Sequence, residues 1–183
     1  NLEVIELEDN QTLNIDTNFD INIQKSDFYD SALIINLDKK KIFNLNDCPI
    51  NSNSELKKFK KIYGNCDFLI TQFSYAAWKG GRENKKWRQI AANEKLNTLV
   101  KQSNIFEAKY LIPFASFVYF SDQYNFYLND SVNTPDKVLS IKSETNSKVL
   151  FLKPYEKILL DDNEINTEGY EFWKEEYIKI QER

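Results

Sequence analysis

The stretch Asp67-Phe68-Leu69-Ile70-Thr71 (DFLIT, 67–71) is a short apolar run, typical of a strand buried on both faces. From Glu83 onward, apolar side chains recur at three- and four-residue spacing over about five turns, which predicts a long helix. This stripe consists of Trp87, Ala91, Ala92, Leu96, Leu99 and Val100. Residues 108–112 (AKYLI) return as a strand that ends at Pro113. Because a strand, a helix and a strand in this order favour a parallel pair, this unit is expected to form the centre of a sheet.

The residues before this unit are typical of short strands joined by turns. Segments 13–15 and 19–23 alternate apolar and polar side chains, and an earlier strand is expected at 4–7. Segments 32–37 and 42–45 flank a charged connection at 38–41, which suits the tip of a hairpin. The N-terminal part is therefore predicted to be an antiparallel meander.

Further elements follow from capping signals and apolar spacing. Ser54 is an expected N-cap for a short helix that Gly64 ends. The remaining elements are expected in this order: a helix over 135–141, short strands around 149–152 and 158–160, and an amphipathic helix from near Thr167.

Length and charge define the broad class. The chain has 183 residues, 24 Lys plus Arg against 28 Asp plus Glu, a net charge of −4, two Cys and no Met. A single globular domain over residues 1–183 is expected, because a chain of this size buries roughly 70% of its unfolded surface. The acidic balance argues against nucleic acid, and no apolar run reaches the ~18 residues of a membrane helix. Two isolated cysteines favour buried thiols and a cytoplasmic location. Without Met, Asn1 is not expected to be the translation start.

The chain also contains no His. It therefore cannot by itself supply a His-rich metal site, a Ser-His or Cys-His pair, or an imidazole base. Ser74 and Ser116 lie outside any G-x-S-x-G elbow, so serine hydrolase chemistry within this chain is rejected.

Three loops that follow apolar strands are candidate functional segments, because ligands gather at the carboxyl ends of strands. The first is 44–49, where Asp47 is expected either to ligate a metal or act as a general base, or simply to form a tight turn.

The second loop, 71–82, carries the pair Gly80-Gly81 before a helix, together with aromatic and basic side chains. Glycine amides and a helix start suit an anion, so an anionic or sugar-like ligand is one interpretation. A surface loop whose aromatic side chains pack on the sheet is the other. The third loop, 113–117, places a small residue between two Phe, which indicates either a loop beside a cavity or core filling.

Three segments resemble one known family when taken together. These are 41–48 (KIFNLNDC), 67–81 and 112–117 (IPFASF). They resemble the second half of the metallo-β-lactamase-like domain in the CMP-N-acetylneuraminate hydroxylase family. The resemblance implies an α+β fold, namely a β-sheet with flanking helices that forms the second half of an αββα sandwich, its upstream half being absent.

The resemblance also implies a metal site at the seam between the halves. Asp47 matches the metal-ligating Asp at a strand end, whereas Ala115 stands where many relatives carry a His. The complete protein would hold zinc or iron, and this chain alone would hold either a degenerate site or no metal. The Rieske ligands of the hydroxylase are missing, so hydroxylation is not carried over.

Two functions follow as hypotheses. In the first, the chain is the C-terminal portion of a metal-dependent hydrolase acting on a nucleotide-sugar or sugar-derived substrate. In the second, it is a non-catalytic binding or interaction module. The expected partner is a complementary N-terminal half or a second copy, which would cover an exposed apolar sheet face. The candidate substrate-binding residues are Ser74, Tyr75, Trp78, Arg82 and Ser116.

Overall fold

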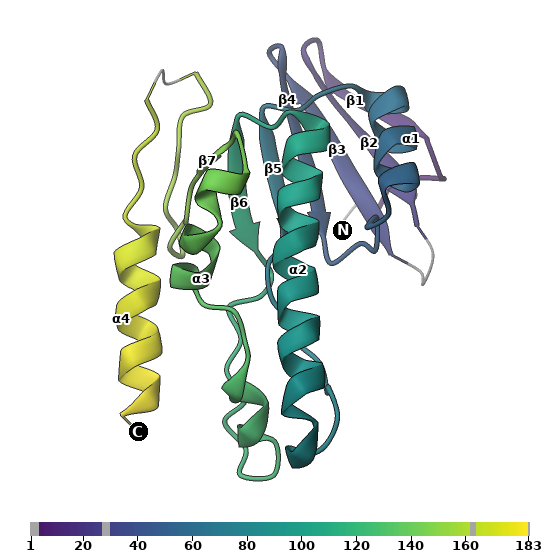
Figure 1. The fold of residues 1–183 in the computed structure, drawn as a ribbon. Coiled ribbons are helices and arrows are strands. Elements are labelled where there is room, and N and C mark those ends of the chain that lie inside the picture. The colour runs from purple at the N-terminus through teal and green to yellow at the C-terminus, as the bar shows by residue number, and fades with distance from the viewer. Residues whose placement is uncertain (1–3, 27–29, 162–163, 183) are drawn as a thin grey trace.

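The computed structural model describes residues 4–26, 30–161 and 164–182. They form an α+β fold around a seven-stranded sheet in which the strands follow one another in chain order (Figure 1). The strands are β1 (Thr12–Asp16), β2 (Phe19–Lys25), β3 (Ser31–Leu37), β4 (Lys40–Asn46), β5 (Phe68–Gln72), β6 (Tyr110–Phe114) and β7 (Lys148–Val149). Strands β1 to β4 pair antiparallel, and β4 to β7 pair parallel. The meander and the parallel pair predicted from the sequence are both confirmed.

The helices lie around this sheet. The α-helices are α1 (Asn53–Tyr63), α2 (Lys85–Phe106), α3 (Pro135–Ser140) and α4 (Gly169–Gln181). Short 3-10 turns are η2 (Arg82–Asn84), η3 (Phe126–Asp130) and η4 (Lys142–Glu144). Helices α1 and α2 cover one face of the sheet, and α4 lies beyond β7 at its edge (Figure 1).

Aromatic rings fill the space between the sheet and the two helices. Phe43 of β4, Phe59 of α1 and Phe106 of α2 are all buried. The Phe43 ring lies 5.1 Å from that of Phe59 and 5.3 Å from that of Phe106, both edge-on. Each such pair contributes about 1 kcal/mol to stability beyond the gain from burying the rings. This cluster therefore holds both helices on the sheet.

The opposite face of the sheet is apolar but less well covered. Ile21, Ile35 and Ile42 lie in register across β2, β3 and β4 and are half-buried. Further along, Phe68 and Ile112 are buried beneath the segment that follows β7. The covering residues of that segment are Leu150, Leu152, Ile158, Leu160 and Ile165.

Some expected elements are absent or shifted. Residues 4–7 form no strand, and neither do 158–160, whose side chains pack on the sheet face instead of joining its edge. The strand expected at 149–152 pairs only at Lys148–Val149. Pro113 lies inside β6 and does not end it. This is tolerated because its nitrogen lies on the side of β6 that faces β7, and β7 pairs only with Tyr110 and Leu111.

Helix starts also differ by a few residues. The cap of α1 is Ser52 and not Ser54, because Ser52 and Glu55 form a reciprocal capping box. The Glu55 amide donates to Ser52 Oγ at 3.2 Å, and the Ser52 amide donates to Glu55 Oε2 at 2.9 Å. Gly64 ends the helix as expected. Helix α4 begins at Gly169, two residues after the expected start.

Candidate functional site

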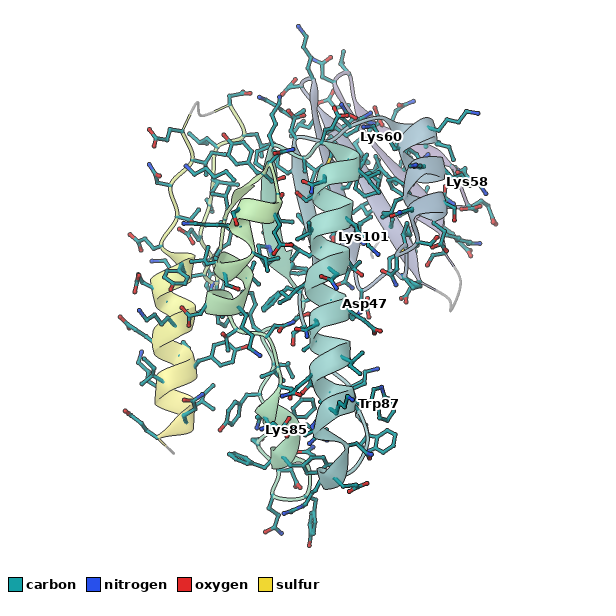
Figure 2. The ribbon with its side chains drawn as sticks, viewed as in Figure 1. Asp47, Lys58, Lys60, Lys85, Trp87 and Lys101 are labelled. Carbon is teal, nitrogen blue, oxygen red and sulfur yellow. The ribbon has the colours of Figure 1, made fainter. Side chains whose placement is uncertain are left out.

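The carboxyl ends of β4, β5 and β6 meet at one edge of the sheet, because these strands run parallel. Asp47 follows β4 directly, after Asn46 turns the chain with a φ of 49°. The Asp47 side chain is exposed and accepts a hydrogen bond from Asn46 Nδ2 at 2.9 Å (Figure 2). The structure thus brings the three candidate loops to one end of the sheet, with Asp47 on its outer surface.

Ser74 and Ser116 join the second and third loops. Both are buried. Ser116 Oγ donates to the Ser74 carbonyl at 3.1 Å and accepts from the Phe73 amide at 3.3 Å. Ser74 Oγ accepts from the Asn133 amide at 2.9 Å. The two hydroxyls are therefore engaged in holding the loops together.

Asn133 is part of this connection, although no sequence motif marks it. It is fully buried, and its Nδ2 donates to the carbonyls of Phe73 at 2.7 Å and Ala92 at 2.8 Å. One side chain thus links the loop after β5, helix α2 and the segment before α3. Its burial depends on partners far away in the sequence, so only the three-dimensional structure reveals it.

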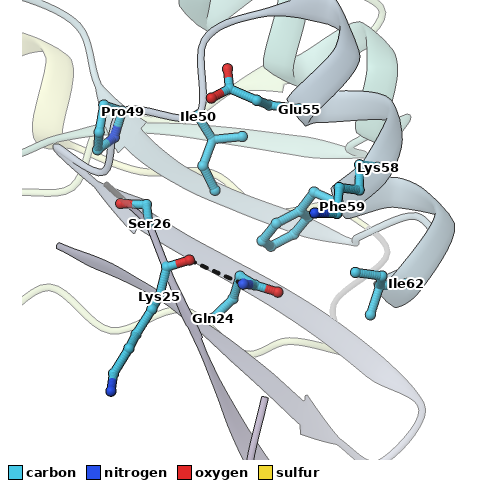
Figure 3. A pocket seen from close by; sticks show the side chains of 9 residues that line it. All are labelled: Gln24, Lys25, Ser26, Pro49, Ile50, Glu55, Lys58, Phe59 and Ile62. Atoms are coloured by element: carbon cyan, nitrogen blue, oxygen red, sulfur yellow. Dashed lines mark hydrogen bonds between the residues drawn. The ribbon is translucent and has the colours of Figure 1, made fainter. Parts of the chain in front are cut away.

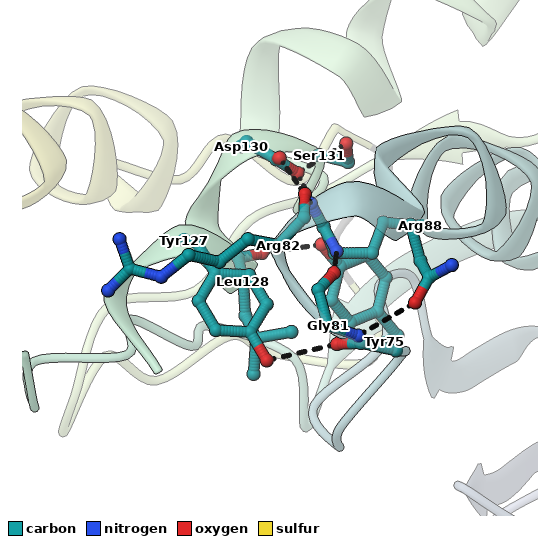
Figure 4. Close-up of polar contacts among 10 residues, drawn as sticks. Tyr75, Gly81, Arg82, Arg88, Tyr127, Leu128, Asp130 and Ser131 are labelled. Carbon is teal, nitrogen blue, oxygen red and sulfur yellow. Dashed lines mark hydrogen bonds and ion pairs between the residues drawn. The ribbon is translucent and has the colours of Figure 1, made fainter. Parts of the chain in front are cut away.

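Arg88 and its partners hold Gly80 and Gly81 in place through hydrogen bonds to their backbone (Figure 4). The Arg88 side chain is fully buried, and its Nη1 donates to the Gly81 carbonyl at 2.6 Å. Tyr127 donates to the Gly80 carbonyl at 3.0 Å, and its ring centroid lies 5.0 Å from the Arg88 guanidinium. The Gly81 amide donates to Asn84 Oδ1 at 2.9 Å. That amide is already bonded within the chain, so the expected glycine cradle for an anion does not form around it.

Asp130 neutralises Arg88. Nε and Nη2 of Arg88 donate to the two Asp130 carboxylate oxygens at 2.8 and 2.7 Å. These hydrogen bonds hold the pKa of Asp130 below its usual value. Because every polar atom of the pair has a partner, the arrangement positions the loop and leaves no free group for chemistry.

Tyr75, Trp78 and Arg82 lie in different environments. Tyr75 is buried and its hydroxyl donates to the Leu128 carbonyl at 2.5 Å, while burial raises its pKa to about 12. Trp78 is 63% exposed and packs edge-on against Trp87, with ring centroids 5.7 Å apart. Arg82 is exposed, with its guanidinium 5.7 Å from the Tyr127 ring centroid. Trp78 and Arg82 are thus the accessible members of the candidate substrate-binding set.

A cavity of about 240 Å³ lies beside the second loop. It is lined by Asn51, Tyr75, Lys79, Ala91, Glu94, Lys95 and Thr98. The Lys95 amine donates to Gln72 Oε1 at the end of β5. Among the ion pairs of the described residues, none includes Lys79 or Lys95. Two cationic side chains therefore line one cavity without a carboxylate bound to either.

The charge state of Lys95 reflects this setting. Burial lowers its pKa most, and the nearby charge of Lys79 lowers it further, while Asp47 and Glu94 oppose the change. Neither lysine belongs to the set of site residues expected from the sequence. The available signal was the position of Lys95, a cation within the apolar stripe of α2.

A second cavity of about 440 Å³ lies beside the third loop. Its walls include Phe114, Phe117, Leu152 and Trp173, and the Phe117 and Trp173 rings stack 3.8 Å apart. Ala115 lines it with a φ of 56°. Of the two interpretations of the third loop, both apply in part, because the loop lines a cavity while Phe117 also packs against the core.

A third cavity, of about 220 Å³, lies between α1 and β2 (Figure 3). Ile50, Phe59 and Ile62 contribute apolar walls. Its acidic side chain, Glu55, is engaged in the cap of α1, so this cavity offers less polar chemistry than the one beside Lys95.

A metal site at Asp47 would need further donor side chains close to it. In the part of the chain that the structure describes, no group of three or more His, Cys, Asp or Glu side chains is placed to hold a metal ion. Structural and catalytic zinc sites use three or four protein ligands. Asp47 therefore does not form a zinc or iron site with the other described residues.

No protein-family model and no curated protein sequence matches the chain. Three solved structures are similar to it at low identity. CmlA, a diiron β-hydroxylase from Streptomyces venezuelae, has a TM-score of 0.46 at 12% identity over 81% of this chain and 33% of its own. A putative zinc-dependent hydrolase of the metallo-β-lactamase superfamily from Thermotoga maritima has a TM-score of 0.45 at 12% identity, over 79% of this chain and 70% of its own.

The third is a metallo hydrolase from the archaeon Ignicoccus hospitalis, with a TM-score of 0.46 at 11% identity over 80% of this chain and 57% of its own. The chain spans about a third of the length of CmlA. No helix among the described residues is long and apolar enough to cross a membrane.

Proposed function

We propose that the chain is a binding module for a small acidic sugar-like molecule, which it holds in the cavity beside Lys79 and Lys95. The observation that carries this proposal is that these two side chains line one cavity while neither forms an ion pair among the described residues. A bound carboxylate or phosphate would accept charge-assisted hydrogen bonds from both amines, in addition to the charges of Glu94 and Asp47, which act on Lys95 without an ion pair.

The position of the cavity supports a ligand site. Lys95 bonds to Gln72 at the carboxyl end of β5, which is the end of parallel strands where ligands usually bind. The loop that supplies Lys79 and Tyr75 is held by Arg88 and Ser116, so its shape is set before a ligand arrives.

The sugar component rests on the exposed tryptophans. Trp87 shares a helix face with Ala91 and Glu94, which line the cavity, and Trp78 precedes Lys79. Aromatic faces suit the apolar side of a sugar ring. The resemblance of the three loops to the CMP-N-acetylneuraminate hydroxylase family favours the same ligand class. Because ligand cavities usually measure ~300–1,000 Å³, 240 Å³ suits one sugar ring better than a whole nucleotide sugar.

The experiment is a calorimetric titration with glucuronate, N-acetylneuraminate and neutral glucose. We expect the two acids to bind and glucose to bind at least about tenfold more weakly, because glucose offers no anion to the lysines. Lys95→Met should weaken binding of the acids by a similar factor. The matched control is Lys101→Met, because Lys101 is exposed on α2 and outside the cavity (Figure 2). Equal affinity for glucose, or no effect of Lys95→Met, would contradict the proposal.

A second function rests on Asp47. Its exposed carboxylate at the strand end could serve a metal-dependent hydrolase if zinc or iron ligands came from a complementary N-terminal half or a second copy. Metal analysis of the purified protein and of Asp47→Ala tests this. Equal zinc and iron contents in the two proteins would show that Asp47 is not a ligand.

A further inference from the structure

We infer that Lys95 is a nucleophile that captures the carbonyl carbon of a small 2-oxo acid as an imine, with Lys79 holding the acid's carboxylate. The inference rests on the proposed function, because it uses the same cavity. It goes further by assigning different roles to the two lysines and by naming a reactive carbonyl as part of the ligand.

The surroundings of Lys95 carry the inference. Its side chain is half-buried in the wall of the cavity, and its amine bonds to a neutral amide oxygen, that of Gln72. The charged groups around it are Lys79 on the second loop, Glu94 on its own helix and Asp47 after β4. None of these carboxylates is ion-paired with it.

An amine attacks a carbonyl only in its neutral form. An apolar setting or an adjacent cation favours that form, and this is how reactive lysines are commonly activated. Partial burial acts in this direction here, and the adjacent cation is present as Lys79, so both lower the pKa of Lys95. Lys101 lies exposed on the same helix and outside the cavity.

The step balances without any further reactant. The nitrogen lone pair of Lys95 adds to the carbonyl carbon, the carbonyl oxygen takes up a proton, and a carbinolamine results. The nitrogen of this carbinolamine still carries the positive charge, so loss of one water gives the iminium ion, and loss of one proton from its nitrogen gives the neutral imine. No electron is gained or lost overall, and the reaction reverses when water adds back.

A 2-oxo acid matches the two side chains because its carboxylate is bonded directly to the reacting carbonyl. A cationic amine beside an amine whose pKa is lowered is complementary to those two groups. A cavity of about 240 Å³ accommodates an acid of a few carbons. The carboxylate would balance the charge of Lys79 while the carbonyl faces Lys95.

The test uses pyruvate with sodium cyanoborohydride, which reduces the imine to a stable carboxyethyl-lysine, followed by peptide mass spectrometry. We expect Lys95 to be the main site of modification, ahead of Lys101, which is exposed on the same helix and outside the cavity. Lys79→Met should slow modification of Lys95 by pyruvate more than by acetaldehyde, because acetaldehyde has no carboxylate and is affected only by the loss of the Lys79 charge that lowers the pKa of Lys95. Modification spread evenly over the exposed lysines would overturn the inference.

Lys95→Arg separates this inference from the proposed function. Arginine keeps the positive charge but forms no imine under these conditions, so the variant should still bind glucuronate and lose the modification. If glucuronate binds and the wild-type protein shows no selective modification, the imine is wrong and the binding function stands. If acetaldehyde modifies Lys95 selectively but no acid binds, the nucleophile stands while the 2-oxo acid and the proposed function are wrong.

Discussion

Arg88 and Asp130 lie 42 residues apart in the chain and form a two-point pair, with Nε–Oδ1 at 2.8 Å and Nη2–Oδ2 at 2.7 Å. The same guanidinium also binds the carbonyls of Gly81 and Arg82. A single buried cation therefore holds the start of α2, the end of the second loop and η3 together. This pair sets the shape of the loop that supplies Tyr75 and Lys79 to the cavity.

Removal of either side chain of the Arg88–Asp130 pair should lower the stability of the protein, because it leaves the other side chain unpaired. We expect Asp130→Asn to lower the free energy of unfolding by about 2–3 kcal/mol, less than for a fully buried pair, since the Asp130 side chain is 26% exposed. Urea unfolding measures this. The control is Lys109→Met, which removes a cation that is 67% exposed and paired to Asp67, and should cost at most about 1 kcal/mol. Equal losses in the two variants would contradict the role given to the Arg88 pair.

The same pair should contribute to acid sensitivity. The pKa of Asp130 is lower in the folded protein than its ordinary value. Its contribution to stability is therefore present above the unfolded pKa of about 4 and is lost as the pH falls through the folded pKa. Between pH 6 and acid conditions, wild-type stability should fall more steeply than that of Asp130→Asn. Parallel curves of unfolding free energy against pH would show that Asp130 does not supply this dependence.

Local patterns predicted most of the sheet correctly. The strand from Phe68 and the strand from Tyr110 are apolar and short, and helix α2 between them carries a long stripe, so their parallel pairing follows from chain order alone. The segment 158–160 is equally apolar, yet it forms no strand. Its apolar side chains are buried against the face of the sheet. An apolar run in a single sequence does not show whether the segment packs on a sheet face or pairs with a strand.

The site was less predictable, because contacts between residues far apart in the sequence decide which of its side chains are exposed and which are bonded within the chain. Asp47, Trp78 and Arg82 are exposed near the expected edge, as loop composition suggested. Ser74 and Ser116 have the right residue type for ligand contact, but their hydroxyls bond within the chain. The cations within the apolar stripe of α2 were the missed signal, since a charge on a buried helix face needs a specific partner.

Ser116→Ala distinguishes a structural role from ligand contact. The substitution leaves the buried Phe73 amide without its acceptor, so we expect a loss of about 1–3 kcal/mol in unfolding free energy. If Ser116 holds the loop without contacting the ligand, glucuronate affinity measured below the unfolding transition should fall by no more than about threefold, the cost of a less well ordered loop. A tenfold loss of affinity in a fully folded variant would restore Ser116 as a substrate-binding residue.

Gly169 and Gly64 offer a matched pair in which steric and conformational costs are separated. A Cβ at Gly169 would lie 2.1 Å from the Phe151 carbonyl oxygen, whereas at Gly64 the nearest atom is Lys41 Nζ at 3.7 Å and φ is +80°. Gly64→Ala should therefore cost only the strain of a backbone at φ 80° and ψ −150°, a conformation found essentially only in glycine, about 1–3 kcal/mol. Gly169→Ala must displace α4 from the segment after β7, and we expect a loss above about 3 kcal/mol, comparable to overpacking a core. Thermal unfolding of the two variants measures the difference, and a Gly169→Ala protein as stable as Gly64→Ala would mean that α4 does not pack against Phe151 as described.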